Sequence, residues 1–483
     1  MEHVDVIIVG AGLSGIGAAC HLQRECPQKR FLILEGRETM GGTWDLFRYP
    51  GVRSDSDMYT LGYRFRPWRE AKAMAGGPAI LNYIRETAAE YDVDKTIRYN
   101  HRVRRASWSS DQARWTVEAE TGDDTLVQLT CNFLYLCTGY YDYANGYTPE
   151  WPGVERFRGT IVHPQKWPAD LDYAGKRVVV IGSGATAITL VPAMAERAAH
   201  VTMLQRSPSY VVSRPAEDPI AKFLRRTLPD RAAYALSRWK NVLAGTFFYN
   251  LARKRPAFFK WMVARGVRNE LGEKYDLKHF TPNYNPWDQR LCLVPDADLF
   301  QTMRDGRVSV VTDRIDTFTE DGLQLQSGER LDADIIVTAT GLVLRLFSRM
   351  QLEVDNVPVE LPKTLVYKGM MFSDVPNIAF AVGYTNASWT LKCDLTSEYV
   401  CRLLNHMDRH AYATCTPRVN DQDVGEEPVI DFNSGYVLRA LDTLPRQGSK
   451  KPWRLHQNYL RDLSLMRYGR LADGAMEFKR NGY

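Results

Sequence analysis

The sequence predicts an α/β fold with two Rossmann-like dinucleotide-binding domains, the second of which carries a helical insertion. Three observations predict this fold. A glycine-rich turn follows an apolar, strand-like run near the N-terminus, a second turn of the same kind lies at residues 182–187, and a basic helical stretch follows the second turn. The 483-residue length agrees, because a single hydrophobic core stops growing at roughly 250–300 residues.

The composition is that of an ordinary globular protein, with 45% hydrophobic and 25% charged residues. The apolar N-terminal run begins with acids at Glu2 and Asp5 and is broken by glycines, and no stretch reaches about 18 uninterrupted apolar residues. The eight cysteines never fall in a CxxC spacing, and no Cys/His cluster has zinc-like spacing. We therefore expect a cytoplasmic protein with reduced cysteines, no metal and no nucleic-acid partner.

The first glycine turn matches GxGxxG through Gly10, Gly12 and Gly15, between the strand-like "VDVIIVG" and a helical run. In such a turn the first glycine allows the tight bend, the second lets the backbone approach a pyrophosphate, and the third packs helix on strand. Glu35 lies about 20 residues further on, at the end of the next strand, where a carboxylate accepts from ribose hydroxyls and repels a 2′-phosphate. The first site therefore suits FAD or NAD, and a plain tight turn is the alternative.

The second glycine turn has the GxGxxA form, through Gly182, Gly184 and Ala187 after "RVVVI". The next strand, "HVTMLQRSP", has Gln205 in the place of the acid and Arg206 directly after it. An arginine without a neighbouring carboxylate favours a 2′-phosphate, so the second site suits NADPH. The alternative is that Arg206 simply ends the strand in solvent. Two dinucleotides on one chain predict hydride transfer from NADPH to a flavin, with FAD at the first turn.

The glycine turns divide the chain into three segments. We expect the first part of an FAD-binding domain at 1–150, an NADPH-binding domain at 151–334 with a helical insertion at about 216–285, and the rest of the FAD-binding domain with a C-terminal segment at 335–483. Two Thr-Gly segments, at 137–139 and 339–341, end apolar strands on either side of the second turn. They are expected either to cross between the domains or to be ordinary strand ends.

The segment "FRGTIVHPQKWP" resembles the FxGxxxHxxxWP signature of Baeyer–Villiger monooxygenases at each fixed position: Phe157, Gly159, His163, Trp167 and Pro168. The segment "GGTWDLFRYPGVRSD" resembles a second signature of that family through Gly41, Gly42, Trp44, Tyr49, Pro50, Gly51 and Asp55. The resemblance covers most of the chain and is less distinctive in the C-terminal third. Flavin monooxygenases that oxidise nitrogen and sulfur resemble the sequence less at Trp167 and Pro168.

This resemblance implies an FAD-containing enzyme that uses NADPH and O₂ to convert ketones to esters or lactones through a flavin C4a-peroxide. A flavin monooxygenase acting mainly on sulfides or amines is the alternative. Arg290 falls where the family has its catalytic arginine, Asp55 where it has the supporting carboxylate, and Trp44 belongs to the cofactor site. For Arg290 the alternative is a structural ion pair with Asp288 on the same strand face. For His163 the resemblance implies a linker role near the domain hinge, whereas an isolated histidine is more often structural.

Residues 219–275 contain thirteen basic and three acidic residues, interleaved with aromatic ones. We expect either a solvated helical insertion over the substrate entrance or a weak peripheral contact with an anionic membrane. Two other classes of protein are rivals. A pyridine nucleotide-disulfide reductase is disfavoured, because no redox-active cysteine pair is present. A non-catalytic nucleotide sensor would also bind both cofactors, but it would not consume oxygen.

Overall fold

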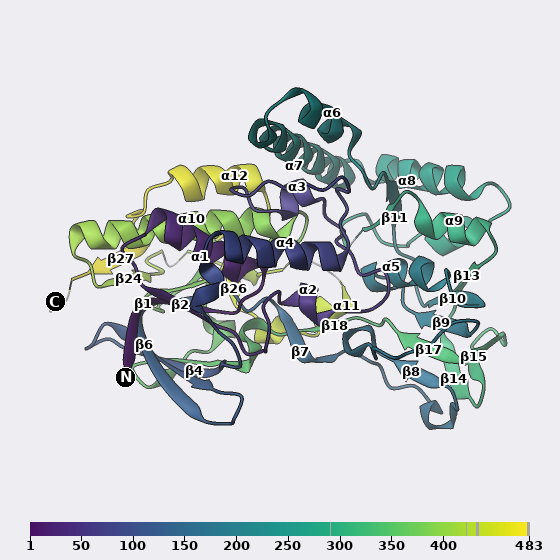
Figure 1. Cartoon of the computed structure of the whole chain (residues 1–483), viewed down its shortest axis with the longest axis horizontal. Coiled ribbons are helices and arrows are strands. Elements are labelled where there is room, and N and C mark those ends of the chain that lie inside the picture. The colour runs from purple at the N-terminus through teal and green to yellow at the C-terminus, as the bar shows by residue number, and fades with distance from the viewer. Residues whose placement is uncertain (290, 422, 431–433, 481–483) are drawn as a thin grey trace.

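The computed structural model of the chain describes residues 1–289, 291–421, 423–430 and 434–480. It contains two α/β units, one built on a nine-stranded sheet and the other on a five-stranded sheet. In Figure 1 the first unit lies on the left, with both chain ends, and the second on the right. The predicted fold class, with two Rossmann-like units, is confirmed.

The first sheet has the order β20-β19-β4-β5-β6-β1-β2-β3, with β23 also paired to β6. Its strands are β1 (Glu2–Val9), β2 (Phe31–Leu34), β3 (Ile97–Arg98), β4 (Arg102–Ser109), β5 (Arg114–Glu120), β6 (Leu126–Leu136), β19 (Gln351–Val354), β20 (Val357–Pro358) and β23 (Ile378–Phe380). The part from β6 to β3 is parallel. Parallel strands are covered on both faces, which is why the last four residues of β1, 6–9, and the whole of β2 are continuous apolar runs.

Three helices accompany the first sheet: α1 (Leu13–Glu25), α4 (Gly77–Glu90) and α10 (Trp389–His410). The helix α10 comes from the C-terminal third and packs against α1, where the Cys26 thiol lies 3.6 Å from the carbonyl oxygen of Cys401. The last part of the chain therefore returns to complete the core of the first unit. Its smaller elements are β21 (Val366–Tyr367), β22 (Met371–Phe372), β24 (Thr414–Pro417), β25 (Glu426–Pro428), α11 (Gly435–Leu438), β26 (Arg446–Gly448), α12 (Tyr459–Leu463) and β27 (Met476–Lys479).

The second sheet is wholly parallel, in the order β13-β10-β9-β17-β8. Its strands are β8 (Thr160–Val162), β9 (Arg177–Ile181), β10 (His200–Gln205), β13 (Val308–Thr312) and β17 (Ile335–Thr338). The helices α5 (Ala185–Met194) and α9 (Asp298–Arg304) belong to this unit, as does a small antiparallel sheet of β14 (Ile315–Thr319), β15 (Gly322–Leu325) and β16 (Arg330–Asp332).

Two short strands connect the units. The strand β7 (Tyr141–Gly146) follows the first Thr-Gly segment, β18 (Leu342–Leu344) follows the second, and the two pair antiparallel. The chain thus leaves the first unit and returns to it along one two-stranded ribbon.

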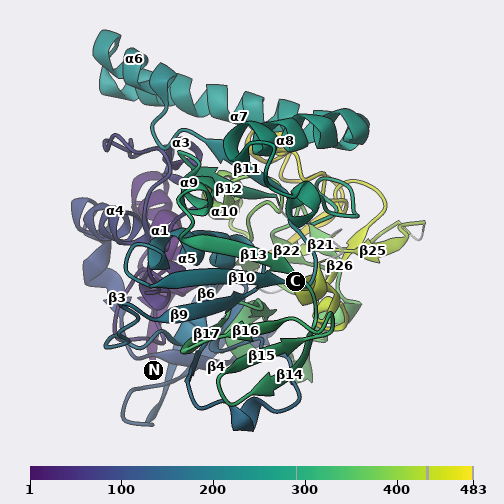
Figure 2. The ribbon, with the colours of Figure 1, turned by 90° about the vertical axis from the view of Figure 1, so that its right-hand side faces the viewer.

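A helical insertion follows β11 (Val211–Arg214) and ends before β12 (Cys292–Pro295), and these two strands pair with each other. It consists of α6 (Pro219–Thr227), α7 (Asp230–Lys254) and α8 (Pro256–Leu271). Figure 2 shows α6 and α7 lying across one end of the molecule, outside both sheets. Within the described ranges no helix is both long and apolar enough to cross a bilayer.

Candidate active site

A cavity of about 780 Å³ lies between the two units. It is lined by the first turns of α1 and α5, by the loop around α2 (Thr43–Leu46), and by residues 137–144, which lead from β6 into β7. The N-termini of two helices that each follow a glycine turn therefore meet one cavity. A helix N-terminus presents free N–H groups and a positive end, which suit phosphate.

An added Cβ would have a different effect at each of the three glycines of the first turn. Gly10 has φ +103°, and a Cβ there would lie 2.6 Å from the carbonyl oxygen of Cys137. A Cβ on Gly15 would clash with the carbonyl oxygen of Gly10. Gly12 is the N-cap of α1 with φ −81° and ψ −171°, and its added Cβ would come no closer than 3.5 Å to a protein atom, the Cα of Gly42. The fold requires Gly10 and Gly15, whereas Gly12 only keeps the space before α1 open.

Glu35 lies just after β2 and is buried at the edge of this cavity. One carboxylate oxygen accepts from the Ala11 amide at 2.8 Å and the other from the Arg37 amide at 3.0 Å. Burial raises the pKa of Glu35 despite these two hydrogen bonds. Each oxygen keeps a second lone pair, so the carboxylate can brace the glycine turn and still accept from a ribose hydroxyl.

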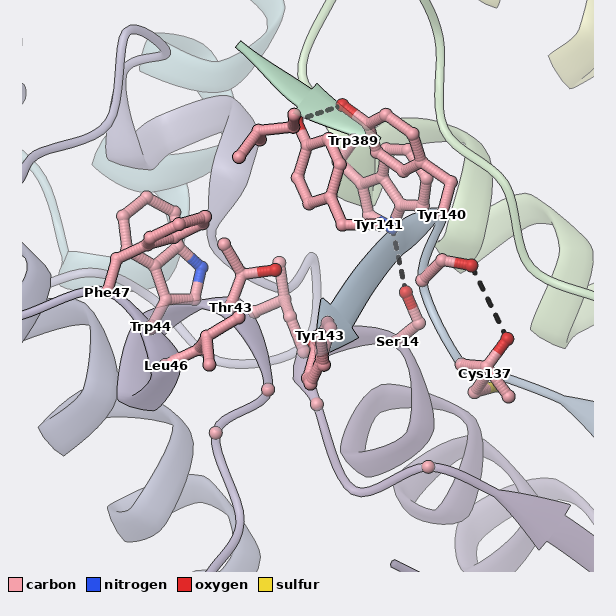
Figure 3. Close-up of a pocket in the computed structure, with 18 of the residues that line it drawn as sticks. Ser14, Thr43, Trp44, Leu46, Phe47, Cys137, Tyr140, Tyr141, Tyr143 and Trp389 are labelled. Atoms are coloured by element: carbon pink, nitrogen blue, oxygen red, sulfur yellow. Dashed lines mark hydrogen bonds between the residues drawn. The ribbon is translucent and has the colours of Figure 1, made fainter. Parts of the chain in front are cut away.

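Aromatic side chains stand on both sides of the cavity. Figure 3 shows Trp44 and Phe47 on one side and Tyr140 and Trp389 on the other. The rings of Tyr140 and Trp389 stack with centroids 4.8 Å apart, and the Trp389 indole donates to the Ser14 hydroxyl at 2.8 Å. Flat apolar walls suit a planar ring system. The sequence prediction included Trp44 but missed Trp389, which begins α10 and carries no motif that points to the glycine turns.

The second glycine turn repeats the geometry of the first. Gly182 has φ +144°, and a Cβ there would clash with the carbonyl oxygen of Ala339. Gly184 is the N-cap of α5 with φ −81° and ψ −178°, and an added Cβ would meet nothing within 4 Å. Ala187, the third position, is fully buried. Both turns therefore hold a glycine that the protein atoms alone do not require, at the place where a pyrophosphate would approach the helix.

Arg206 directly follows β10 and is exposed. Beside it the Ser183 hydroxyl donates to the carbonyl oxygen of Ser207 at 2.9 Å, which ties this strand end to the glycine turn. Gln205 is buried and donates to the carbonyl oxygen of His279 and to Thr312. The structure thus presents a guanidinium near the second turn and no acid at position 205. That Arg206 reads a 2′-phosphate stays a prediction.

The segment that carries the family signature lies along β8. A Cβ on Gly159 would clash with the carbonyl oxygen of Asp334, so this glycine permits close backbone packing. Phe157 is buried against Phe318, with ring centroids 6.4 Å apart. Trp167 packs partly buried against the core of the second unit, and Pro168 follows it.

His163 sits at the ribbon that joins the units. Its Nε2 donates to the carbonyl oxygen of Gly341 at 3.3 Å, and its Nδ1 accepts from the Gln165 amide at 3.2 Å. Burial lowers the pKa of His163, consistent with the neutral ring that this bonding pattern requires. A Cβ on Gly146 would overlap the ring. The ring therefore binds a backbone carbonyl beside the ribbon, and the hinge role stays a prediction.

A second cavity, of about 1110 Å³, lies under the helical insertion and is lined by the inner faces of α7 and α8. Four of the described residues line both cavities: Asp55, Ser56, Leu293 and Ala387. Asp55 therefore stands where the first cavity opens into the second. Arg290, the predicted catalytic arginine, lies outside the described residues.

The expectation that Asp288 lies on a strand is wrong. It lies in a turn, and β12 begins only at Cys292. The backbone turns here because Trp287 adopts φ +70°. The Asp288 carboxylate accepts from Arg253 of α7 at 2.9 Å and from the Asn285 amide at 3.0 Å.

The roof of the second cavity is anchored in both units. From α7, the buried Arg238 donates to the carbonyl oxygens of Tyr59 and Gly62 at 2.9 and 2.8 Å and to Asp394 of α10 at 3.1 Å. From α8, Phe259 and other apolar residues join the core of the second unit. Removing one partner of a buried charge pair costs about 3–5 kcal/mol, so Arg238 fixes α7 firmly to the first unit.

Two glycine turns of the dinucleotide-binding type face one cavity, and a second cavity adjoins it. This arrangement is that of a two-domain pyridine nucleotide-dependent oxidoreductase. Comparison with known proteins narrows the class. The chain belongs to the flavin-binding monooxygenase-like family, because residues 76–405 match the family described as "Flavin-binding monooxygenase-like". Residues 8–72 match an NAD(P)-binding Rossmann-like domain.

Among curated proteins, the chain is 56% identical to the FAD-containing monooxygenase EthA of Mycobacterium tuberculosis, over 99% of this chain and 98% of that one. It is 47% identical to the probable FAD-binding monooxygenase AlmA of Acinetobacter baylyi, over 99% of this chain and 96% of that one. Among solved structures, an oxidized steroid monooxygenase bound to NADP shares the fold, with a TM-score of 0.77, 22% identity and coverage of 99% and 100% of the two chains. These comparisons confirm the prediction of a flavin-dependent monooxygenase, and they confirm FAD and NADPH as the cofactors of its family.

Proposed function

We propose that the protein is a cytoplasmic, NADPH- and O₂-dependent monooxygenase that contains FAD and converts ketones to esters or lactones. The observation that carries the proposal is the position of Asp55 at the junction of the two cavities. A carboxylate there lies between the space that fits a flavin nucleotide and the space that fits an apolar substrate.

The glycine turns support two dinucleotides. Gly12 and the N-terminus of α1 would hold the FAD pyrophosphate, and Glu35 would accept from its ribose. Gly184 and the N-terminus of α5 would hold NADPH, with Arg206 on the 2′-phosphate. Bound there, FAD would supply the acceptor for the hydride of NADPH and the group that activates O₂.

The remaining chemistry falls to the side chains at the cavity junction. A guanidinium suits this place, because it stays charged and presents several donors to oxygen atoms that become negative as a ketone is attacked. We assign this role to Arg290, and we assign to Asp55 the role of orienting the Arg290 guanidinium. Leu291, the next residue along the chain, lines the second cavity.

The test supplies the purified holoenzyme with NADPH, air and a panel of linear, cyclic and aromatic ketones plus a thioether, and identifies the products by mass. We expect esters or lactones that contain one added oxygen. A sulfoxide without any ester would favour the alternative, a flavin monooxygenase of sulfides or amines. Nucleotide binding without oxygen consumption above that of free flavin would identify a sensor instead of an enzyme.

Arg290→Ala separates its chemical role from a structural one. We expect the variant to bind FAD and to oxidise NADPH, while ester formation falls by about 10²- to 10³-fold and hydrogen peroxide accumulates. Arg290→Lys restores the charge without the planar fork, so only partial recovery is expected. An unchanged ratio of ester to NADPH per bound flavin would refute the assignment.

A further inference from the structure

The exposed large apolar side chains of the described residues are concentrated in the helical insertion. Ten of them lie between residues 220 and 261: Ile220, Phe223, Leu228, Leu236, Trp239, Leu243, Phe247, Phe248, Phe258 and Trp261. Single exposed apolar residues are normal on a protein surface, but a group of this density marks a binding surface.

On α7 the exposed apolar residues form one stripe. Leu236, Leu243 and Phe247 recur at helical spacing and are 50%, 52% and 62% exposed. The opposite face of the helix holds Tyr234 and Arg238, which are buried against the first unit. The helix therefore has a second apolar face that its own fold does not cover.

The helix α8 repeats this arrangement. Phe259 and Val263 are buried in the core of the second unit, whereas Phe258 and Trp261 are 50% and 55% exposed. The rings of Phe258 and Trp261 contact each other with centroids 5.8 Å apart, and the Arg265 guanidinium lies 5.6 Å from the Trp261 ring. An aromatic pair beside an exposed arginine is typical of a surface that is apolar and cationic together.

The charges beside these stripes are mostly uncompensated. Within the described part of the chain, no carboxylate lies in ion-pair range of Arg226, Lys254, Arg255 or Lys260, although other basic residues of the insertion are paired. The whole segment 219–275 has thirteen basic and three acidic residues. A strongly positive face with exposed aromatic residues complements anionic lipid headgroups above acyl chains.

We propose that the outer face of α6, α7 and α8, which we call the docking face, binds the surface of an anionic lipid bilayer. The helices would lie in the interface with Leu243, Phe247, Phe258 and Trp261 inserted and the basic residues at headgroup level. The inner faces of α7 and α8 line the second cavity, so docking would bring the roof of that cavity against the lipid. The proposal does not depend on which substrate is oxidised.

The test measures binding of the holoenzyme to sedimented vesicles, made either of phosphatidylcholine alone or of phosphatidylcholine with 30% phosphatidylglycerol. We expect binding only to the anionic vesicles, weakened by about tenfold or more in 0.5 M salt. Leu243→Ser with Phe247→Ser, and separately Phe258→Ser with Trp261→Ser, should each weaken binding by at least about tenfold. None of these four residues lines the second cavity, so FAD content and NADPH oxidation should not change.

Matched controls use exposed residues far from the docking face. Leu126→Ser and Val357→Ser remove apolar side chains that are 66% and 65% exposed and should leave vesicle binding unchanged. Lys254→Glu should weaken binding, whereas Lys176→Glu should not. Absence of binding by the unmodified protein, or equal losses in the controls, would overturn the proposal. If light scattering shows that the docking-face variants turn a dimer into a monomer, and the vesicles bind nothing, the face joins two copies of the chain and the lipid proposal is wrong.

Discussion

Gly184→Ala tests whether the glycine in the second turn is needed to make room for a nucleotide or is needed for the chain to fold. Gly184 has φ −81° and ψ −178°, which alanine adopts without strain, and its added Cβ would meet nothing within 4 Å. The folded protein should therefore tolerate the methyl group. Removing a glycine from the unfolded chain is even expected to stabilise the fold by about 0.4–1 kcal/mol.

The added methyl group should be unfavourable only when NADPH binds. A methyl group at the N-cap of α5 would displace the pyrophosphate from the helix N-terminus. Losing charge-assisted hydrogen bonds worth about 1.5–3 kcal/mol corresponds to a roughly 10- to 100-fold rise in Kd. FAD content should stay unchanged, because the other turn is untouched.

The assay combines flavin content per chain, the thermal midpoint and the Kd for NADP⁺. Gly12→Ala is the matched variant: its N-cap geometry is the same, so it should lose FAD and leave the second site open. Gly15→Ala is the contrasting control, because its Cβ clashes with the carbonyl oxygen of Gly10 and the fold itself should suffer. A Gly184→Ala protein with unaltered Kd for NADP⁺ would refute the placement of the pyrophosphate.

Three further predictions address charged groups. Glu35→Ala should lower FAD retention without changing the preference for NADPH, and full flavin content with an altered nucleotide preference would show that the two turns are assigned in reverse. Arg206→Ala should weaken NADPH roughly 10- to 100-fold and NADH hardly at all, whereas equal losses would exclude a 2′-phosphate contact. Burial disfavours the charged form of His21, but hydrogen bonds to Asp394 and Glu25 outweigh it and raise its pKa to about 9. Because this pKa lies above the ordinary histidine value of about 6.5, the stabilisation, on the order of 3 kcal/mol, is present below pH 6.5 and is lost as pH rises to 9. The thermal midpoint should fall over that window in the unmodified protein, and much less in His21→Gln.

The turns and the sheets could be predicted because their signals are local. A glycine at a tight bend, an apolar run of strand length and a carboxylate after the next strand lie within one supersecondary unit, as at Gly10 and Glu35. Gly182 and Gly184 predict the second unit by the same local signals. The structure adds that, among the glycines of the two turns, Gly12 and Gly184 are the ones whose added Cβ would clash with no described protein atom, a distinction that no spacing rule contains.

The parts of the site that depend on long-range packing could not be predicted. Trp389 reaches Ser14 only because α10 packs on α1, across 375 positions of the chain. Arg238 belongs by sequence to the basic segment 219–275, although it is buried and bonded to the first unit. The sequence predicts a strand at Asp288, but the positive φ of Trp287 turns the chain before β12 begins.

The helical insertion is attached to both units, so it connects them and does not move as a flap hinged on one unit. Since α7 is fastened to the first unit through Arg238 and α8 is embedded in the second through Phe259, a rotation of one unit against the other must slide one helix past the other. The width of the second cavity then follows the angle between the units. Substitutions that admit bulkier substrates are accordingly expected at the β7–β18 ribbon, around His163 and Gly146, neither of which lines the second cavity.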